Sequence, residues 1–373
     1  MPAGFLRNEN SPQHGDALYL APLPNLVQAM RALTLVEHGG MDRLLVQDVP
    51  TPSVDGPDQI RISVKAAALN RLDLFILGGL PGITLGFPHV VGTDAAGVVD
   101  QVGAGVSGLA PGDRVVVNPG LSCGVCPMCQ SGEDPFCRNF QILGEHRAGT
   151  VAEYLVVPAR NVVKVSDRLN WAEAAALPLA ALTAWRMIVS RARVETGETV
   201  LIWGIGGGVS LAALQIAKHQ GARVVVTSSS DAKLVAAKAL GADLTLNHGT
   251  QDVAKEVRAW TKRGADVVVD SVGEKTWDKS LKALRPGGRL VTCGATTGPH
   301  VQIDIRKLFW FQWTIMGSTM GSVPEFEAMM ASANSGAIVP VVDLIVPMDQ
   351  GLKAYQRMES GEQMGKVVIE VSP

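Results

Sequence analysis

The stretch TVLIWGIGGGVSLAALQIAKHQG, residues 199–221, decides the fold. Its first residues are apolar and predict a buried strand, and the residues after the glycines predict a helix that ends at a glycine. Glycines at such a turn let the backbone approach a pyrophosphate, and the helix start offers free N–H groups and the positive end of its dipole. We therefore expect this turn to hold a dinucleotide. The residues expected to bind it are Gly204, Gly206, Gly207, Gly208 and Val209.

The glycine pattern admits more than one interpretation. Val209 stands where the strict G-x-G-x-x-G pattern has its third glycine, and a G-x-x-G-x-x-S pattern through Ser210 fits equally well. An ordinary tight turn between a strand and a helix would use similar residues. The binding interpretation is favoured because residues 222–296 alternate between Val-, Ile- and Leu-rich strands and helices. This alternation predicts a doubly wound parallel sheet that is covered on both faces, as in a Rossmann domain.

The end of the second strand bears on the choice of dinucleotide. A carboxylate at this place would bind an adenosine ribose and repel a 2′-phosphate. The chain instead has a run of hydroxyl side chains, with Ser228 and Ser229 as candidate phosphate ligands and Lys233 as a nearby cation. We therefore expect NADP(H) rather than NAD(H), and Asp231 is the evidence against that choice.

Length and composition exclude several classes of protein. At roughly 100–200 residues per domain, 373 residues predict two domains, and 47% hydrophobic residues can fill two cores. A net charge of −2 without a basic stripe argues against a nucleic-acid partner or an anionic membrane. The chain lacks an apolar run of about 18 residues and the apolar core of a secretory signal. We expect a soluble, cytoplasmic protein that acts on a small molecule.

The chain before the glycine turn has a different character. From residue 30 to about 165, short β-rich runs such as QIRISVKAAAL (59–69) are separated by Gly, Pro and Asp turn signals. Such spacing predicts a barrel-like all-β domain. Residues 1–29 are polar, then weakly apolar, and are interpreted as an N-terminal extension. Two β runs near the C-terminus, VPVVDLIVP and GKVVIEV, could join either domain.

Four of the five cysteines lie within LSCGVCPMCQSGEDPFC, residues 121–137. Cys123, Cys126, Cys129 and Cys137 have the spacing C-x2-C-x2-C-x7-C, and four thiolates can close a tetrahedral Zn²⁺ site that has no open position for catalysis. An iron–sulfur cluster is the closest rival, but its last gap is shorter. A nucleic-acid zinc module would need basic and aromatic residues. We expect one structural zinc in a lobe at about 120–140.

Several of these motifs occur together in one known family. They are GTDAAGVVDQVGAGVSGLAPGDRVV (92–116), the four-cysteine lobe, LTAW (182–185), the glycine turn and GKVVI (365–369). Through them, the chain from about Met30 to its end resembles the zinc-type alcohol dehydrogenases and quinone oxidoreductases of the medium-chain dehydrogenase/reductase superfamily. The resemblance implies hydride transfer in a cleft between two domains, and a homodimer or homotetramer. The implied domains are a GroES-like β-barrel catalytic domain at 30–185, a Rossmann cofactor-binding domain at 186–321 and a C-terminal return to the catalytic domain at 322–373.

The chain departs from this family where the resemblance would place a catalytic zinc. The first cysteine ligand is replaced by Asn70, and the family's acidic residue follows as Asp73. Thr93 and Asp94 replace a His-Glu pair, and Leu179 stands at the third ligand position. An amide, a hydroxyl and a leucine do not make a zinc site. The Asn70-x-x-Asp73 pattern resembles that of the zinc-free quinone oxidoreductases.

We therefore expect an NADPH-dependent oxidoreductase that transfers hydride to an activated alkene or a quinone without a catalytic zinc. A few hydrogen-bond donors suit an enolate better than the alkoxide that a zinc ion would stabilise. One alternative is an alcohol dehydrogenase with an atypical metal site that uses Asp94 and His146. Another is a cofactor-binding protein without turnover.

Individual residues of the expected cleft follow from the motifs and the resemblance. Asn70 is expected to orient the substrate or a water, and an amide that caps a turn is its alternative role. Asp73 is a further catalytic candidate, although a part in the structure of the cleft is favoured for it. Thr183 is expected to touch the nicotinamide. His146 is a candidate proton donor, and His248 is a candidate for stacking or phosphate binding near the adenosine. The remaining expected neighbours of the cleft are the GSTMGS segment (317–322) and the apolar side chains of Leu74, Phe75, Leu80, Trp310 and Trp313.

Overall fold

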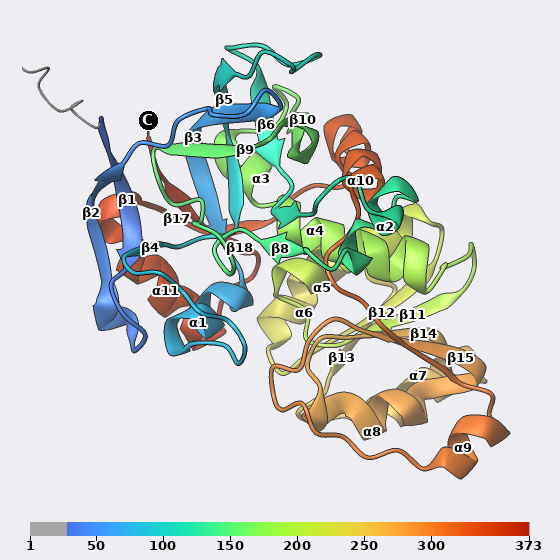
Figure 1. The fold of residues 1–373 in the computed structure, drawn as a ribbon. Helices are drawn as coiled ribbons and strands as arrows, with labels where there is room; N and C mark the ends of the chain where they lie inside the picture. Colours follow the sequence, from blue (N-terminus) through green and yellow to red (C-terminus); the bar gives the residue numbers. More distant parts are fainter. Residues whose placement is uncertain (1–27, 373) are drawn as a thin grey trace, which may run out of the picture.

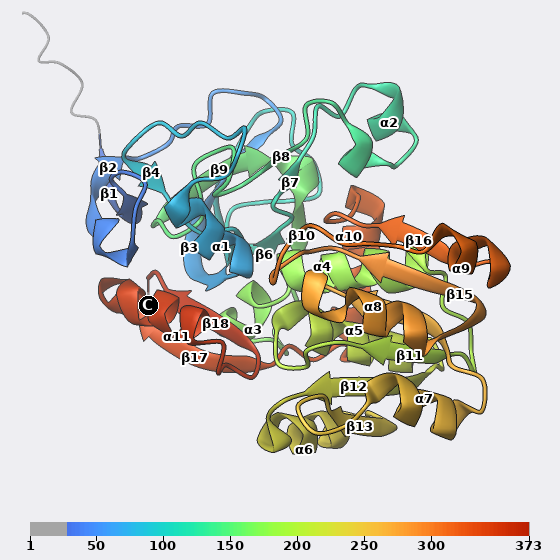
Figure 2. The same ribbon diagram turned by 90° about the horizontal axis from the view of Figure 1, so that it is seen from below.

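The computed structural model describes residues 28–372, so the extension expected at 1–29 lies almost entirely outside the described residues. The described chain forms a β-barrel half and an α/β half that meet along one side (Figure 1). Figure 2, turned by 90°, shows the same division from below. This is the combination of folds that the sequence predicts.

The barrel half is built on a sheet with the order β10-β6-β5-β3-β18-β17, and β9 pairs with β3 as well. Along β3, Ile60, Ile62 and Val64 are buried while the residues between them are partly exposed, which is the predicted alternation of the two faces. The strands are β3 (Gln59–Leu69), β5 (Asp94–Val102), β6 (Arg114–Val117), β9 (Tyr154–Pro158), β10 (Val162–Lys164), β17 (Val342–Pro347) and β18 (Lys366–Glu370).

Smaller elements complete this half. A second sheet has the order β2-β1-β4, and β7 pairs with β8 at the base of the cysteine lobe. The two C-terminal runs that could have joined either domain form β17 and β18, which are continuous with β3 of the barrel sheet. The remaining elements are β1 (Ala29–Leu35), β2 (Leu44–Pro50), β4 (His89–Val90), β7 (Gly120–Leu121), β8 (Gln141–Ile142), α1 (Arg71–Gly78), α2 (Pro127–Gln130) and α11 (Gly351–Ser360).

The α/β half contains a six-stranded parallel sheet with the order β13-β12-β11-β14-β15-β16. The direction of winding reverses between β11 and β14, and in such sheets ligands bind beyond the carboxyl ends of the strands at this point. The strands are β11 (Thr199–Ile202), β12 (Arg223–Ser228), β13 (Leu244–Asn247), β14 (Ala265–Asp270), β15 (Leu284–Thr292) and β16 (Thr314–Gly317).

Helices cover both faces of this sheet (Figure 1). Val200 and Ile202 of β11 point into one buried cluster with α5 and α6, while Leu201 points into a second cluster with α7 and α8. Continuous apolar strands are therefore explained by burial on both sides. The helices are α5 (Gly208–His219), α6 (Asp231–Ala239), α7 (Val253–Thr261), α8 (Glu274–Ala283) and α9 (Ile305–Trp310).

Three helices connect the halves and pack between them: α3 (Trp171–Ala175), α4 (Pro178–Trp185) and α10 (Val323–Ser335). Pro178 begins α4, which is the interruption that the sequence predicts, because a proline is tolerated in the first turn of a helix. A π-helical turn, residues 186–191, leads from α4 towards β11. Among residues 28–372, no helix combines the length and apolar character that a membrane crossing requires.

Candidate active site

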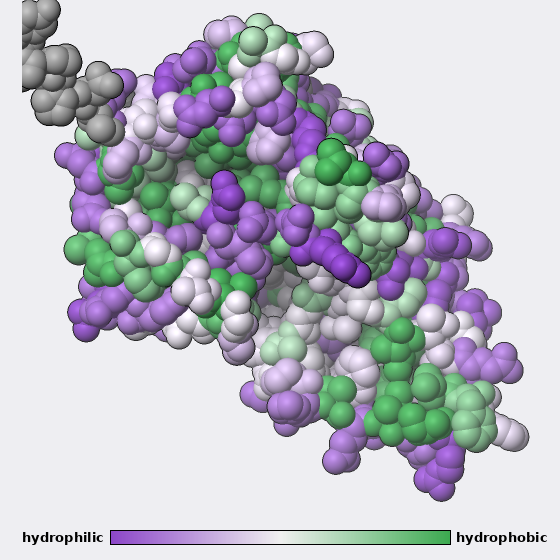
Figure 3. Space-filling model, in the orientation of Figure 1, coloured by the Kyte–Doolittle hydropathy of each residue, from purple (hydrophilic) through white to green (hydrophobic). Residues whose placement is uncertain are grey.

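A cavity of about 530 Å³ lies between the two halves. Its wall includes residues 204–209 of the glycine turn on one side, and Asn70, Phe75 and Lys366 of the barrel half on the other. The space-filling view shows a hollow at this junction (Figure 3). All nine residues that the sequence predicts to hold the cofactor are on this wall. They are Gly204, Gly206, Gly207, Gly208, Val209, Ser228, Ser229, Lys233 and His248.

The glycine turn has the geometry that a dinucleotide pyrophosphate needs. Gly204 and Gly206 have φ values of +67° and +133°, which side chains rarely adopt. Ser210 Oγ donates to the carbonyl oxygens of Gly204 and Gly207, at 3.1 and 2.9 Å, so the serine of the alternative pattern closes the turn. No side chain among residues 28–372 caps the N-terminus of α5, and the first residues of this helix, Gly208 and Val209, line the cavity. These residues fit the phosphates of a dinucleotide.

The second strand of the α/β sheet ends at Ser228, without a carboxylate. The carboxylate of Asp231 accepts a hydrogen bond from Asn247 Nδ2 at 2.7 Å. Lys233 Nζ donates to the carbonyl oxygen of Gly361 at 2.8 Å, and a Cβ on Gly206 would lie 3.2 Å from the same Nζ. The ammonium of Lys233 therefore lies beside the glycine turn, and partial burial lowers its pKa.

His248 lies at the same end of the cavity. Its Nδ1 is 3.2 Å from Thr227 Oγ1, and its ring centroid is 6.2 Å from that of Trp203. Burial and, to a smaller extent, the charge of Lys279 lower the pKa of His248. A neutral imidazole ring on the wall offers a flat surface for an adenine base.

At the inner end of the cavity, sheet pairing brings three polar residues together. Asn70 follows the end of β3, Asp94 begins β5 and Lys366 begins β18. In the antiparallel pairs β3–β5 and β3–β18, Ala68 is opposite Asp94 and Leu69 is opposite Val367. The three side chains therefore start from the same edge of the sheet. We call Asn70, Asp94 and Lys366 the polar cluster.

The polar cluster is buried and closely bonded. Lys366 Nζ lies 2.5 Å from Asn70 Oδ1 and 2.9 Å from Asp94 Oδ2, and Asn70 Nδ2 donates to Asp94 Oδ2 at 2.9 Å. Asp94 Oδ1 accepts from the backbone N–H of Leu179 at 2.8 Å, in the first turn of α4. The side chains of Lys366 and Asp94 are 5% and 0% exposed. An ammonium thus occupies a place between an amide and a carboxylate that the sequence analysis did not foresee.

Asp73 has a supporting position and does not line the cavity. Its Oδ2 accepts from the backbone N–H of Asn70 at 2.6 Å, which fixes the start of α1, and Thr93 Oγ1 lies 3.4 Å from its Oδ1. Burial raises the pKa of Asp73 to about 7, against the lowering effects of the Asn70 N–H and the Lys366 charge. Asp73 therefore supports the cleft by orienting Asn70, because Asn70 and Asp73 form a capping box.

Residues from two further segments that were expected near the nicotinamide are on the cavity wall. Thr183 of α4 lines the cavity, as do Thr319 and Met320 of the GSTMGS segment. His146, which was expected in the cleft if it donates a proton, is not on the cavity wall. His146 Nδ1 accepts from the backbone N–H of Ile142 at 3.2 Å, and the residue on the wall is its neighbour Glu145. Burial raises the pKa of Glu145, and the charge of His146 acts in the opposite direction.

Of the five apolar side chains expected next to the cleft, that of Phe75 lines the cavity. Leu74 and Leu80 pack instead against the core of the barrel half. Trp310 of α9 is 76% exposed, and Trp313 Nε1 donates to the carbonyl oxygen of Arg285 at 3.0 Å. Both tryptophans lie next to β16, one of the two outermost strands of the α/β sheet, and neither is on the cavity wall.

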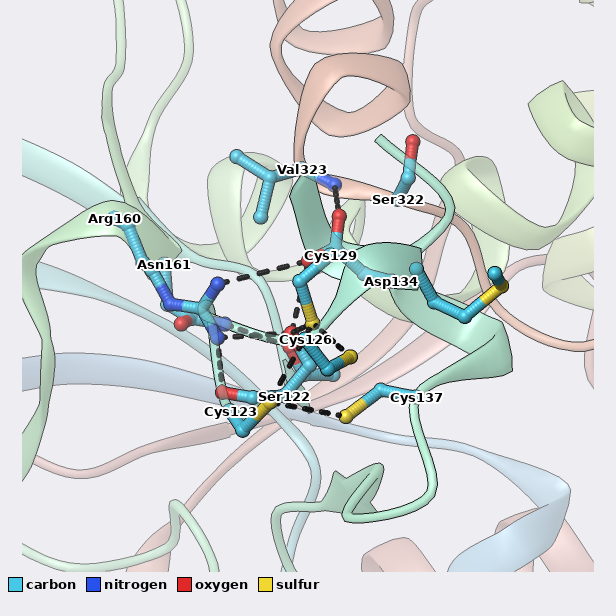
Figure 4. A network of polar contacts seen from close by, with 12 residues as sticks. Ser122, Cys123, Cys126, Cys129, Asp134, Cys137, Arg160, Asn161, Ser322 and Val323 are labelled. Carbon is cyan, nitrogen blue, oxygen red and sulfur yellow. Dashed lines mark hydrogen bonds and ion pairs between the residues drawn. The ribbon is translucent and has the colours of Figure 1, made fainter. Parts of the chain in front are cut away.

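The four cysteines converge on one point of their lobe (Figure 4). All four Sγ atoms lie within 4.8 Å of one another, with neighbouring pairs at 3.5, 3.5 and 3.9 Å. Tetrahedral zinc with Zn–S bonds of about 2.3 Å needs sulfurs about 3.8 Å apart, so the lobe fits this ion. Backbone N–H groups of Val125 and Cys126 lower the pKa of Cys123 to about 6, which favours a thiolate. Within residues 28–372, this is the sole group of three or more His, Cys, Asp or Glu side chains with such spacing.

The cysteine lobe is attached to the helix that follows the GSTMGS segment. Asp134 accepts from the backbone N–H of Val323, at the start of α10, at 3.1 Å, and from Ser122 Oγ at 2.8 Å (Figure 4). Arg186 is buried and pairs with Glu133 of the lobe at 2.7 Å and with Glu325 of α10 at 2.8 Å. The lobe therefore supports α10 next to Thr319 and Met320 on the cavity wall.

Comparison with known proteins establishes the family. Residues 56–167 match the alcohol dehydrogenase GroES-like domain and residues 208–335 match the zinc-binding dehydrogenase family. A zinc-type alcohol dehydrogenase-like protein of Schizosaccharomyces pombe is 35% identical over 351 residues, which are 92% of this chain and 99% of the relative. The chain is a medium-chain dehydrogenase/reductase. It is accordingly an NAD(P)-dependent oxidoreductase.

Solved structures of this superfamily have the same fold. The crystal structure of an NAD-dependent alcohol dehydrogenase has a TM-score of 0.89 at 45% identity, and covers 92% of this chain and 100% of its own. A 2-octenoyl-CoA carboxylase reductase in complex with NADP and 2-octenoyl-CoA has a TM-score of 0.84 at 30% identity, and covers 94% of this chain and 88% of its own. Proteins of this fold therefore include an alcohol dehydrogenase and a reductase that binds an unsaturated CoA thioester.

Proposed function

We propose that this chain uses NADPH to reduce an activated alkene, such as an enone, or a quinone, without a catalytic zinc. The observation that carries the proposal is the polar cluster at the inner end of the cavity. In zinc alcohol dehydrogenases, a metal ion stabilises the alkoxide. Here the corresponding positions hold Asn70, Thr93 and Leu179, and the Lys366 ammonium is 2.9 Å from Asp94. A positive charge at this place opposes the binding of a second cation.

The reaction divides into parts that the residues on the wall can perform. A bound reduced nicotinamide would supply a hydride, that is, a proton and two electrons, to the β-carbon, which is the alkene carbon not attached to the carbonyl group. The electron pair of the C=C bond then moves towards the carbonyl oxygen, and an enolate forms on the substrate. Thr183 lies on the wall where it can contact the nicotinamide, and Asn70 orients the substrate or a water. A proton added to the α-carbon completes the reduction.

We assign the proton donor to Glu145 rather than to His146. Glu145 is on the cavity wall and its side chain is 14% exposed, whereas His146 is not on the wall. Because burial raises the pKa of Glu145, more of it is protonated near neutral pH than of an ordinary glutamate. The assignment replaces the histidine that the sequence analysis named as a candidate.

We further propose NADP(H) as the cofactor and one structural Zn²⁺ at the four cysteines. The serines at the end of β12 offer hydroxyl groups where a carboxylate would repel a 2′-phosphate, and Asn247 holds Asp231 in a hydrogen bond. The related carboxylase reductase binds NADP, whereas the related alcohol dehydrogenase is NAD-dependent. Dissociation constants for NADPH and NADH, measured by quenching of tryptophan fluorescence, should differ at least tenfold in favour of NADPH. Equal values would contradict the cofactor proposal.

A second candidate function is alcohol oxidation, which the names of the relatives favour. The deciding experiment follows the loss of NADPH absorbance with a panel of enones, enoyl thioesters and quinones. A second assay follows the appearance of NADPH or NADH absorbance when NADP⁺ or NAD⁺ is mixed with a panel of alcohols. We expect turnover with the first panel. Turnover with alcohols alone would establish the second candidate, and tight NADPH binding without turnover on either panel would indicate a binding protein.

We also propose that the chain forms a homodimer or homotetramer in the cytoplasm. β16 is an outermost strand, and Ile305, Phe309 and Trp310 of the adjacent α9 are each at least 60% exposed. Apolar surface gathers at this end of the molecule (Figure 3). An edge of β16 that no strand of residues 28–372 pairs, beside exposed aromatic rings, favours pairing with a second copy. Light scattering should give at least twice the chain mass, and a Phe309→Asp/Trp310→Asp variant should give the chain mass.

A further inference from the structure

An acidic residue lies next to the nucleoside end of the cavity but does not line it. Asp231 is in the first turn of α6, between Ser229 and Lys233 in the sequence, and both of these neighbours line the cavity. Asp231 itself lines a separate groove along α6 and β13. Within residues 28–372, the single acidic residue on the cavity wall is Glu145, which belongs to the barrel half. The nucleoside end is therefore free of carboxylates, although one is available beside it.

Asn247, the last residue of β13, holds the carboxylate of Asp231 in this groove. Its Nδ2 donates to Asp231 Oδ1 at 2.7 Å and lies 3.4 Å from the carbonyl oxygen of Ser229. The other end of the amide is fixed as well, because Asn247 Oδ1 accepts from the backbone N–H of Gly249 at 3.0 Å. An amide has N–H donors at one end only, so the contact with Gly249 decides that this end faces Asp231.

The backbone holds Asn247 in a fixed relation to the end of the second strand. In the parallel pair β12–β13, Asn247 is opposite Ser228. Its backbone N–H donates to Gln251 Oε1 at 2.7 Å, and its carbonyl oxygen accepts from the backbone N–H of Gln251 at 2.8 Å. Asp231 is exposed, so its side chain is free to adopt another rotamer once the Asn247 amide no longer binds it.

The cavity wall beside Asp231 offers hydrogen-bond donors. Ser228 Oγ accepts from the backbone N–H of Ser230 at 3.1 Å, which leaves the hydroxyl hydrogen of Ser228 for a ligand. Ser229 and the ammonium of Lys233 belong to the same wall. These groups suit a 2′-phosphate, whereas a carboxylate among them would bind a ribose hydroxyl and repel that phosphate. The direction in which the Asp231 side chain points therefore bears on which dinucleotide binds.

We propose that Asn247 is a positioning residue for cofactor specificity, which holds the Asp231 carboxylate away from the cavity and thereby maintains the preference for NADP(H) over NAD(H). This inference rests on the proposed NADP(H) cofactor and names the residue that sets the preference. Asn247 is not on the cavity wall, so it acts through Asp231. Asp231 has a separate structural role, because an acidic residue in the first turn of a helix is stabilised by the helix dipole.

The test compares two variants that keep the shape of the Asn247 side chain. Asn247→Asp replaces the amide donor with a second carboxylate, which repels Asp231 from the groove. Asp231→Asn/Asn247→Asp exchanges the two groups, so that the hydrogen bond forms again with the net charge of the wild type. The Kd values of NADPH and NADH are measured by quenching of tryptophan fluorescence. We expect the ratio of the NADPH value to the NADH value to rise about tenfold in Asn247→Asp. In the exchange variant, it should return to within threefold of the wild-type ratio.

Asn170→Asp is the matched control, because it makes the same change at the N-cap of α3, away from the cavity wall, and should leave the ratio unchanged. An unchanged ratio in Asn247→Asp would overturn the inference. An equal rise in Asn247→Asp and in the exchange variant would overturn it as well, because the charge at position 247 would then act without Asp231. If Asn247→Asp does not fold, Asn247→Ser is compared with Asp231→Asn/Asn247→Ser, and the ratio should rise only in the variant that keeps Asp231.

The failure of this inference is distinguishable from that of the proposed cofactor. If the wild-type chain prefers NADPH and Asn247→Asp keeps that preference, the role of Asn247 is wrong and the cofactor proposal stands. If the wild-type chain binds both dinucleotides equally, but Asn247→Asp raises the ratio and the exchange variant restores it, the role of Asn247 stands and the cofactor proposal is wrong. Thermal unfolding of each variant shows that the comparison is made on folded protein.

Discussion

At the scale of single residues, the position of Asn70 could be predicted from the sequence, but its cation partner could not. Its place in the N-x-x-D pattern predicted a position in the cleft, and the structure puts it on the cavity wall. Its cation partner could not be predicted, because Lys366 is 296 positions away and meets Asn70 only through the pairing of β3 with β18. The same limit explains Glu145 and His146, which are neighbours in sequence but differ in whether the side chain reaches the wall.

The pH dependence of stability tests the burial of Asp73. Its folded pKa of about 7 lies above its ordinary value of 3.8, so between these pH values the folded chain keeps a proton that the unfolded chain has released. This contribution to stability is complete below about pH 4 and is lost as the pH rises through 7. In urea unfolding, Asp73→Asn should therefore gain stability relative to wild type across this window, by at most about 1.4 kcal/mol per pH unit. A difference that is constant with pH would contradict the assignment.

The pH dependence of kcat tests the assignment of Glu145 as the proton donor. If its protonated carboxyl gives the proton to the α-carbon, kcat of the wild type falls as the pH rises past the raised pKa of Glu145. Glu145→Gln should lower kcat by about 10²- to 10⁴-fold and remove this limb from the pH profile. Glu359→Gln, at an exposed position of α11, should keep the wild-type profile. A Glu145→Gln variant with the same limb would identify another proton donor.

At the scale of elements, the glycine turn was predictable and the cleft walls were not. A strand, a glycine cluster and a helix are adjacent in sequence, so their pattern contains the whole motif. The walls come from segments that are far apart, and Trp310 and Trp313 lie instead at the outer strand of the sheet. The apolar character of β17 and β18 is that of strands in either half, so only the family resemblance predicted their return to the barrel half, where β18 pairs with β3.

A substitution at Gly208 tests whether the side chain of Lys366 must pack against the glycine turn. A methyl group at this position would lie 2.8 Å from Lys366 Cδ and 2.9 Å from Ala180 Cβ, so Gly208→Ala must displace the lysine or the start of α5. We expect the Kd of NADPH to rise about tenfold, or 1.4 kcal/mol, together with a fall in kcat. Gly86→Ala is the control, because a Cβ there meets no atom within 4 Å. An unchanged Kd and kcat for Gly208→Ala would show that the turn tolerates a side chain.

Metal removal tests the cysteine lobe as a support for α10. Cys137 is buried, and Cys137→Ser should lose the bound zinc, lower the unfolding temperature and increase hydrogen exchange at the start of α10, which Asp134 holds through Val323. Cys293→Ser is the matched control, because this cysteine lies outside the four-cysteine group and should leave the zinc content unchanged. Full zinc content in Cys137→Ser would exclude a four-cysteine site.

At the scale of the whole molecule, the two halves contribute different parts of one site. The α/β half supplies the glycine turn and the nucleoside end of the cavity, while the barrel half supplies the polar cluster. The family and both folds could be predicted from the sequence, since each motif lies within one continuous segment. The substrate side could be predicted only as a set of missing metal ligands, because what replaces the metal depends on how the halves meet.

The most direct test of this account is the number of zinc ions per chain in protein that turns over. Elemental analysis is combined with the rate of enone-dependent NADPH oxidation on the same preparation, before and after dialysis against a chelator that removes loosely bound ions. We expect one zinc per chain, held by the four cysteines, and an unchanged rate after dialysis. A second zinc per chain that is lost in parallel with activity would contradict the claim that protein donors carry the charge of the substrate.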